Sequence, residues 1–497
     1  MSTSATTGSP SREESGWDAT SLFLLVAIAV VLIGRLPALG VRFFDPDELE
    51  HAHAAWSVFR GLVPYRDFFE HHTPWSYYAL SPFFRWFAVD QSFETARRFL
   101  IFARALSVGL TALSAFLIFR VGRLVANRKA GLLAALFLVG QPVVIQKTLE
   151  IRPDVPALPF FLGGLWFLLR GVKPSDDAAP SQLRWFFGGG LCLGASIMCT
   201  QKALFVLPGA LTGLGLWAIA GGGRLLRARV LALLMVLVGV AVPGALTWAA
   251  FALHGGGAQF IHDNFVLNAH WKARSNRHLA IVLETSWPIL ILGIVGTAGA
   301  LSRLRRTTPR PPDDVLLLCT LGGLIAGLVV LPAAYRQYYL MPLPIVCVYA
   351  AKGLLVLVER ARERVRAPLL GGTIAVLLIW PVVELARSAI TRRDDRQTAR
   401  LRYVFAHTAP SDPVLDGWMG TAVFRPHPLY YAFMHGELRA MLSEQQKDDY
   451  VTALESGAAR PALITLDDEL RALGPRFMRF VWTNYVSKDG LFYFPAR

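Results

Sequence analysis

Hydrophobic residues along the chain gather into long blocks separated by short polar connections. About 20 consecutive apolar residues can cross a bilayer as a helix, and about eleven blocks approach that length. They lie at residues 20–37, 99–120, 130–147, 155–170, 185–201, 203–221, 228–253, 281–301, 314–332, 340–358 and 368–387. This pattern predicts an all-α polytopic membrane protein.

The last hundred or so residues have a different pattern, with mixed charges, turn residues and only short apolar runs. A segment of this size can hold its own core, so residues 390–497 are predicted to form a small soluble α/β domain. The remaining chain divides into an N-terminal tail at 1–19 and a membrane domain at 20–389. The first block lacks the features of a cleaved signal peptide, so we expect it to be retained.

Basic residues cluster in every second connection between the apolar blocks, for example at 120–129 and 303–310. Cytoplasmic loops of membrane proteins carry such an excess of Lys and Arg. The pattern places the N-terminus in the cytoplasm, and the first loop (38–98) and the C-terminal domain outside the cytoplasmic membrane. Most of the net charge of +15 is explained in this way, and no nucleic acid partner is expected.

The first outward loop is the richest in chemistry. Acidic residues and histidines gather there between aromatic segments, at Asp45, Asp47, Glu48, Glu50, His51, His53, Asp67, Glu70, His71 and His72. Carboxylates placed between apolar segments lose solvation, which raises their pKa unless a cation is near. Such a carboxylate is a candidate general base, and carboxylates beside histidines can bind a divalent cation.

Cations stand beside these acids on the same predicted face, against the positive-inside pattern. They are Arg152, Lys202, Lys272, Arg274 and Arg336. Ionisable groups at membrane depth are usually functional, and an anionic ligand such as phosphate would account for them. Carboxylates and cations facing a lipid surface suit transfer of a group from a lipid-linked phosphate to a hydroxyl.

The motifs of these outward segments resemble those of a known superfamily. Pro-Asp-Glu at 46–48, the stretch at 61–74 and Arg-Pro-Asp at 152–154 are similar to the GT-C membrane glycosyltransferases. Within that superfamily the chain looks like glycosyltransferase family 39, which includes protein O-mannosyltransferases and lipid A aminoarabinose transferases. The resemblance implies inverting transfer of a sugar from a polyprenyl-phosphate donor to a lipid, glycan or protein acceptor.

Roles for individual residues follow from this resemblance. It implies that Asp47, with Glu48 beside it, and Asp154 are the catalytic acids. Contacts to the donor phosphate are expected at His72, Arg152, Lys202, Arg274, Arg336 and Tyr339. His72 stands where relatives usually carry a Lys, and His71 and His270 are expected to hold a divalent metal cation, if one is used.

The residues themselves leave several alternatives open. Spacing does not decide whether Asp45, Asp47 or Glu48 is the base; Asp47 is our choice. A flippase or transporter of a lipid-linked sugar would instead need a polar path through the membrane, for which Arg35 and Arg104 are the main candidates. A non-enzymatic assembly protein of the cell envelope would bind its partner through residues 390–497 alone.

Overall fold

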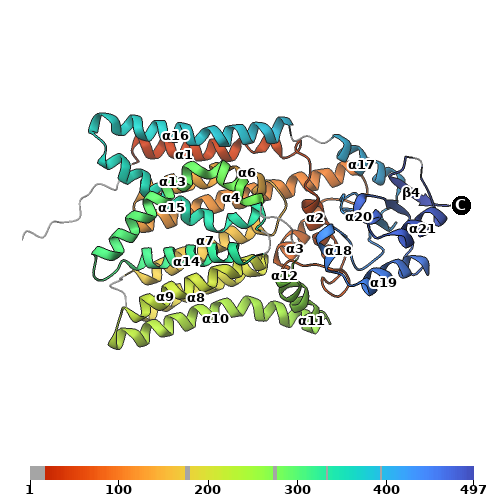
Figure 1. Cartoon of the computed structure of the whole chain (residues 1–497), viewed down its shortest axis with the longest axis horizontal. Coiled ribbons are helices and arrows are strands. Elements are labelled where there is room, and N and C mark those ends of the chain that lie inside the picture. Colours follow the sequence, from red (N-terminus) through yellow and green to blue (C-terminus); the bar gives the residue numbers. More distant parts are fainter. Residues whose placement is uncertain are drawn as a thin grey trace, which may run out of the picture.

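Long helices form a bundle, and a smaller domain lies at one end of it in the computed structural model (Figure 1). The structure describes residues 17–173, 179–271, 277–331, 334–391, 395–487 and 489–496. The long helices are α1 (Ala19–Ile33), α4 (Phe93–Val125), α5 (Arg128–Gly140), α6 (Pro142–Thr148), α7 (Asp154–Val172), α8 (Ala179–Cys199), α9 (Val206–Ile219), α10 (Gly223–Leu253), α13 (Arg277–Arg306), α14 (Pro312–Val330), α15 (Pro342–Arg360) and α16 (Glu363–Ala386).

Nine helices in the described part of the chain are long and apolar enough to cross a membrane. The pair α5 and α6, bent by 65°, adds a tenth candidate if it is one span. The helix α8, with 21 residues, corresponds to one further predicted block. The predicted all-α multi-span architecture is therefore confirmed, and each of the eleven apolar blocks has a counterpart in the bundle.

Small residues let neighbouring helices approach closely. A Cβ atom on Gly296 of α13 would lie 1.9 Å from the carbonyl oxygen of Tyr349 of α15, and one on Gly190 of α8 would lie 2.2 Å from that of Val236 of α10. Both distances are impossible for a real side chain. Glycine at such crossings allows the backbone contact on which helix association in membranes depends.

The first loop, at residues 38–98, is largely helical. It contains α2 (Pro46–Phe59), α3 (Trp75–Leu80) and the 3₁₀ segments η1 (Leu36–Ala38) and η2 (Ser81–Trp86). A later connection holds α11 (Gly257–Ile261), the π-helical segment η4 (His262–Val266) and α12 (Leu267–Ala269). Two 3₁₀ segments, η3 (Gln201–Phe205) and η5 (Arg336–Leu340), follow α8 and α14. These segments lie at the end of the bundle that carries the smaller domain (Figure 1).

The C-terminal domain confirms the predicted α/β composition. A second π-helical segment, η6 (Arg387–Thr391), precedes it. Its helices are α17 (Asp395–His407), α18 (Gly436–Met441), α19 (Glu444–Glu455), α20 (Asp468–Arg471) and α21 (Pro475–Asn484). Its strands are β1 (Val414–Asp416), β2 (Leu463–Thr465), β3 (Tyr485–Ser487) and β4 (Phe492–Pro495). They form one sheet in the order β1-β2-β4-β3, in which β1 and β2 are parallel and the other pairs antiparallel.

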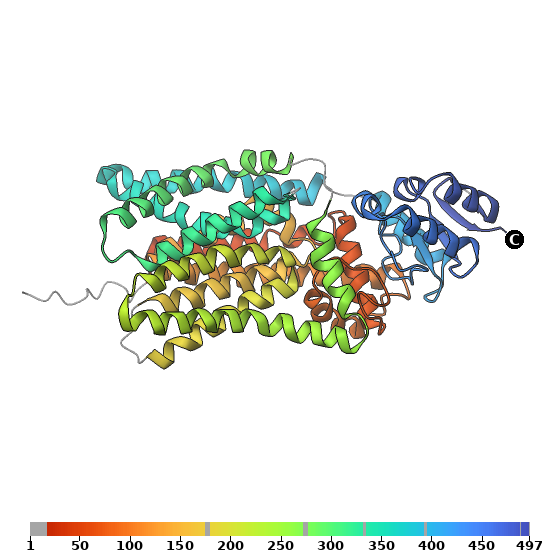
Figure 2. The ribbon, with the colours of Figure 1, turned by 60° about the horizontal axis from the view of Figure 1, so that its bottom comes forward.

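This domain is packed against the bundle, as the rotated view also shows (Figure 2). Phe424 shares an apolar cluster with Phe84 and Phe99, whose rings stack at 3.9 Å. The buried guanidinium of Arg425 donates to the carbonyl oxygens of Thr408 and Asp90, and so ties the domain to the first loop. The position of the domain is therefore fixed by both apolar and polar contacts.

Candidate functional site

A cavity of about 450 Å³ lies between the end of the bundle and the C-terminal domain. Its size falls within the usual range for small-molecule sites. It is lined by Asp45, Asp47, Glu50, His51, His71, His72, Lys147, Arg152, Gln201, Lys202, Asn268, Trp271, His278, Tyr335, Arg336, Gln337, Tyr338, Trp418, His435 and Glu437. The cavity thus brings together five segments that sequence analysis had singled out separately.

The first turn of α2 places the acidic residues. Asp45 caps the helix by accepting from the backbone N–H of Asp47, and Glu48 completes the capping box by accepting from the N–H of Asp45. Pro46 at the first helical position is favourable because its ring fixes the required φ. Asp47 and Glu50, three residues apart on this helix, both line the cavity.

Glu48 does not line the cavity, contrary to its expected catalytic role. Its carboxylate is fully buried and accepts two hydrogen bonds from Arg104, at 2.9 and 2.6 Å. It also accepts from the backbone N–H of Ile151 at 3.1 Å. With both oxygens occupied, Glu48 joins α2, α4 and the 149–153 connection and does not reach the cavity.

A cluster of paired charges surrounds Asp47, and we call it the paired cluster. Its members are Arg42, Asp45, Asp47, Lys147, Glu150 and Arg152. Arg152 lies 2.7 Å from Oδ2 of Asp47 and 3.2 Å from Oδ1 of Asp45, and it also contacts Glu150. Because three carboxylates already hold Arg152, it is better placed to orient Asp47 than to bind a phosphate as the sequence predicted.

The two aspartates of this cluster differ in their pKa. Burial, together with Glu150, raises the pKa of Asp45 to about 6. Burial also opposes ionisation of Asp47, but the charges of Arg152 and Lys147 outweigh it and lower the pKa of Asp47. Both oxygens of Asp45 face cations, whereas within the described residues the ion pair of Asp47 reaches its Oδ2 alone. Asp47 is therefore ionised at neutral pH and offers a free oxygen to the cavity.

Lys202 and Asp154 form a second charged pair. Nζ of Lys202 lies 3.2 Å from Oδ1 of Asp154 and 4.6 Å from the centre of the Tyr338 ring. Lys202 lines the cavity, whereas Asp154 is buried behind it. Asp154 thus holds the lysine in place, and it is not itself among the residues that line the cavity.

Arg336 has a different environment from the other cations. Its Nη1 donates to the side-chain oxygen of Gln146 at 3.1 Å, and its buried Nε has no hydrogen-bond partner. Among the described residues, no carboxylate forms a salt bridge with it. Tyr339, which was expected to contact the phosphate with it, lies instead in the apolar core, and Tyr338 lines the cavity. Because η5 is a 3₁₀ turn, Tyr338 lines the cavity where Tyr339 was expected.

His72 is unsuited to the role of the Lys that it was expected to replace. Its Nδ1 lies 3.0 Å from a carboxylate oxygen of Glu70, to which an Nδ1–H donates. Burial, and then the charge of Lys202, lowers the pKa of His72 to about 3, so the ring is neutral. In this tautomer Nε2 has a lone pair and no proton, and it cannot donate to a phosphate.

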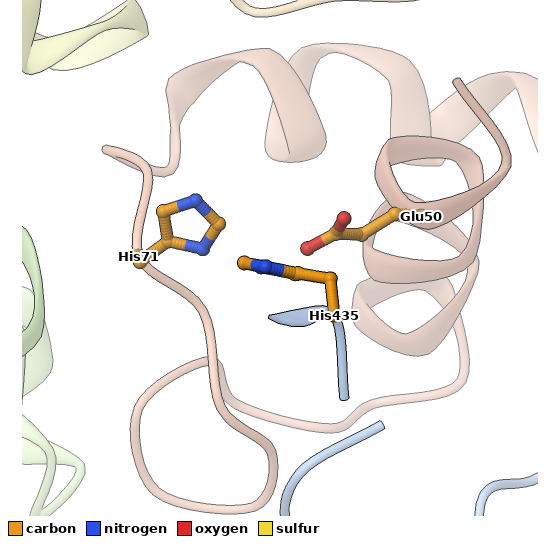
Figure 3. A group of neighbouring side chains, drawn as sticks. All are labelled: Glu50, His71 and His435. Carbon is orange, nitrogen blue, oxygen red and sulfur yellow. The ribbon is translucent and has the colours of Figure 1, made fainter. Parts of the chain in front are cut away.

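A second group of side chains comes from three separate segments. Glu50 of α2, His71 and His435 of the C-terminal domain are all buried, and their potential ligand atoms lie within 4.8 Å of one another. Figure 3 shows the three side chains directed toward a common point. Glutamate and two histidines are a donor set suited to zinc, so the residues present fit a divalent metal cation.

The other predicted ligands lie apart from this group. His270 is exposed, and its Nδ1 contacts the backbone carbonyl of Val266. It is not among the residues that line the cavity. Arg274 lies outside the described residues.

Three cavity residues from the C-terminal domain were missed by sequence reasoning. They are Trp418, His435 and Glu437. Trp418 belongs to a Gly-Trp-Met-Gly stretch that resembles an ordinary turn in sequence, but its backbone is held by two acids, of which Asp416 is fully buried. Asp467 accepts from the N–H of Trp418, and Asp416 from that of Met419. The signal that could have indicated this part of the site was a tryptophan in a short stretch bounded by glycines.

Comparisons with known proteins identify chains of similar fold. The family model for dolichyl-phosphate-mannose-protein mannosyltransferase matches residues 81–248. No protein in the curated set matches the sequence. Among solved structures, ArnT from Cupriavidus metallidurans bound to undecaprenyl phosphate matches with a TM-score of 0.64 and 14% identity, over 96% of this chain and 98% of that one. The chain therefore has the same fold as ArnT, in line with its predicted resemblance to GT-C proteins.

A second GT-C structure gives the same fold. The oligosaccharyltransferase AglB from Archaeoglobus fulgidus, in complex with an inhibitory peptide and a dolichol-phosphate, matches with a TM-score of 0.59 and 11% identity. The match covers 96% of this chain and 74% of AglB. The predicted resemblance to GT-C membrane glycosyltransferases is thereby confirmed for the fold.

Proposed function

We propose that this GT-C protein transfers a sugar from a polyprenyl-phosphate donor to a hydroxyl group of a lipid, glycan or protein acceptor. Transfer takes place at the outer face of the cytoplasmic membrane and inverts the anomeric carbon. The observation that carries this proposal is one cavity that holds both an ionised, partly free carboxylate, Asp47, and a cation without a carboxylate partner, Arg336.

Each group has a defined part in the reaction. Asp47 removes the proton of the acceptor hydroxyl while the oxygen of that hydroxyl attacks the anomeric carbon of the sugar. The bond between that carbon and the phosphate oxygen breaks, and polyprenyl phosphate leaves with both electrons of the bond. Arg336 and Lys202 stabilise the charge that develops on the leaving phosphate, while Arg152 keeps Asp47 ionised and oriented.

An apolar groove of about 420 Å³ adjoins the cavity and supports a lipid-linked substrate. It is lined mainly by α3, α4 and the connection at residues 151–153, and it shares His51 and Arg152 with the cavity. Residues such as Leu106 and Leu110 give it an apolar surface. We place the polyprenyl chain there, because its first isoprene units can then stay in an apolar environment while the phosphate reaches the charged cavity.

The two alternative functions have less support. Arg35 and Arg104, the candidates for a transport path, are both fully buried and held by hydrogen bonds, Arg35 to Thr148 and Arg104 to Glu48. The C-terminal domain lines the same cavity as the first loop. This shared cavity does not favour a partner-binding role for the domain alone.

A transfer assay tests the proposal. Purified protein in proteoliposomes is supplied with radiolabelled polyprenyl-phosphate sugars and membrane extracts as acceptors, and mass spectrometry identifies the product. Asp47→Asn should lower turnover by about 10²–10⁴-fold, the usual contribution of a general base, with unchanged membrane insertion.

Glu94→Gln is the matched control, since Glu94 is an exposed acid whose partner is the surface residue Arg402. Near-normal turnover of Asp47→Asn would remove Asp47 as the base, and donor movement without a glycosylated product would favour a flippase.

A further inference from the structure

The backbone and ring of His71 are held in place by neighbouring residues, while its Nδ1 has no hydrogen-bond partner. Its carbonyl oxygen accepts from the side-chain amides of Gln201 and Asn268, both at 2.8 Å. Its ring stacks between Phe69 and Trp271, with centroids 5.9 and 5.0 Å away. The side chain is only 10% exposed, yet Nδ1 has no hydrogen-bond partner, and Oε1 of Glu70 lies 3.9 Å from it. A polar atom of this kind needs a ligand, because leaving it unpaired costs about 1–3 kcal/mol.

His435 is oriented by a neighbouring carboxylate. Its Nδ1 lies 3.3 Å from Oε2 of Glu437, whose other oxygen accepts from the hydroxyl of Tyr335 at 3.3 Å. Nδ1 also accepts from the backbone N–H of Leu438 at 3.3 Å, because His435 is the N-cap of α18. Binding a cation through Nε2 therefore requires the other tautomer, in which Nδ1–H donates to Glu437. Carboxylates commonly orient metal-binding histidines in this way.

Glu50 supplies the negative charge. It is 91% buried, and among the described residues no salt bridge reaches it. A buried carboxylate that lacks a cation is costly in its ionised form, and a bound metal ion would remove that cost.

We propose that Glu50, His71 and His435 bind one zinc ion, which clamps the C-terminal domain onto the first outward loop. The ligand atoms lie within 4.8 Å of one another, so bonds of about 2.0–2.2 Å to a shared ion require only small movements. All three residues line the cavity, which gives the ion a path of entry. Two imidazoles favour zinc over magnesium. The site goes beyond sugar transfer and does not depend on it.

A neighbouring group is a weaker candidate. His51, Glu70 and His72 are also close enough to hold an ion. However, Nδ1 of His51 lies 3.1 Å from the hydroxyl of Tyr77, and Nδ1 of His72 is bonded to Glu70. Oε1 of Glu70 also accepts from two backbone N–H groups. The carboxylate of this group is therefore already held by three hydrogen bonds, which weighs against a bound ion.

Zinc binding to the full-length protein tests the site. The protein is purified without a polyhistidine tag, stripped with EDTA and titrated with Zn²⁺, and bound metal is measured by mass spectrometry after desalting. We expect about one zinc per chain and a higher melting temperature with Zn²⁺, but no such shift with Mg²⁺. Glu50→Gln, His71→Ala and His435→Ala should each weaken zinc binding by more than about tenfold.

Two histidine controls make the result specific. His270→Ala and His72→Ala should bind zinc as the wild type does, and size-exclusion chromatography checks that every variant is folded. Limited proteolysis of the wild type needs no variant, and Zn²⁺ should slow cleavage within residues 414–441. The proposal is overturned if the wild type retains no zinc, if His435→Ala binds it normally, or if His72→Ala loses it instead. Zinc content reports on this site whether or not sugar transfer is detected.

Discussion

Two parts of the cavity differ in how their charges are balanced. In the paired cluster, Arg42, Lys147 and Arg152 face Asp45, Asp47 and Glu150. Arg336 and Glu50, in contrast, have no salt-bridge partner of opposite charge among the described residues. Balanced charges hold a geometry without a ligand, whereas unbalanced ones become favourable only when a ligand supplies the missing charge. The comparison assigns structure and orientation to the first part, and ligand binding to the second.

The largest effect on stability is expected from breaking the paired cluster. Glu150→Gln leaves Arg42, Lys147 and Arg152 with a neutral partner in a buried site. Removing one member of a buried ion pair typically costs about 3–5 kcal/mol, so the melting temperature in detergent should fall sharply. Glu94→Gln, in which an exposed acid is changed in the same way, should stay within about 0.5 kcal/mol of the wild type. Equal melting temperatures for the two variants would contradict the structural role of the cluster.

A smaller effect, on binding instead of stability, is expected at Arg336. Because no carboxylate depends on it, Arg336→Gln should leave the melting temperature nearly unchanged. Loss of a charge-assisted hydrogen bond costs about 1.5–3 kcal/mol, so the KM for the lipid-linked donor should rise by at least about tenfold. Steady-state kinetics with varied donor measure this change. A melting temperature that falls as far as that of Glu150→Gln would place Arg336 among the structural residues.

The smallest effect concerns the pH dependence of stability. The pKa of Asp45 is about 6 in the folded protein, against an ordinary value of 3.8. Between these values the folded protein keeps a proton that the unfolded chain has lost, so the contribution of Asp45 to stability decreases as pH rises through this window. The slope is at most about 1.4 kcal/mol per pH unit. Asp45→Asn, which can still cap α2, should remove this slope in melting curves recorded from pH 4 to 7; an unchanged slope would assign it to another group.

Much of the fold was predictable because membrane helices are coded locally, by runs of apolar residues. The segments that form the site were also predictable, since Asp47, Arg152, Lys202 and Arg336 stand out as charges beside apolar blocks. The exact partners were not. Glu48 proved structural because Arg104, 56 residues away, reaches it from α4. No local pattern reports a contact at that separation.

Two other differences have local causes that the sequence pattern did not reveal. Tyr338 instead of Tyr339 lines the cavity because η5 is a 3₁₀ turn, whose phase a motif does not define. Nε2 of His72 has no proton to donate because Glu70, two residues earlier, accepts from its Nδ1–H. His435 is a different case, since it lies more than 360 residues from His71 along the chain and only the docked domain brings the two together.

The docking of the C-terminal domain also constrains how the chain is threaded through the bilayer. Trp418 and His435 share a cavity with Asp47 and His71, so the first loop and the tail must be in the same compartment. The chain must therefore cross the membrane an even number of times between them. If α5 and α6 together make one crossing, this parity requires α8 to be a crossing as well, which gives ten crossings after α1. The cavity shared by the first loop and the C-terminal domain thus requires an even number of membrane crossings between them, whichever side of the membrane it faces.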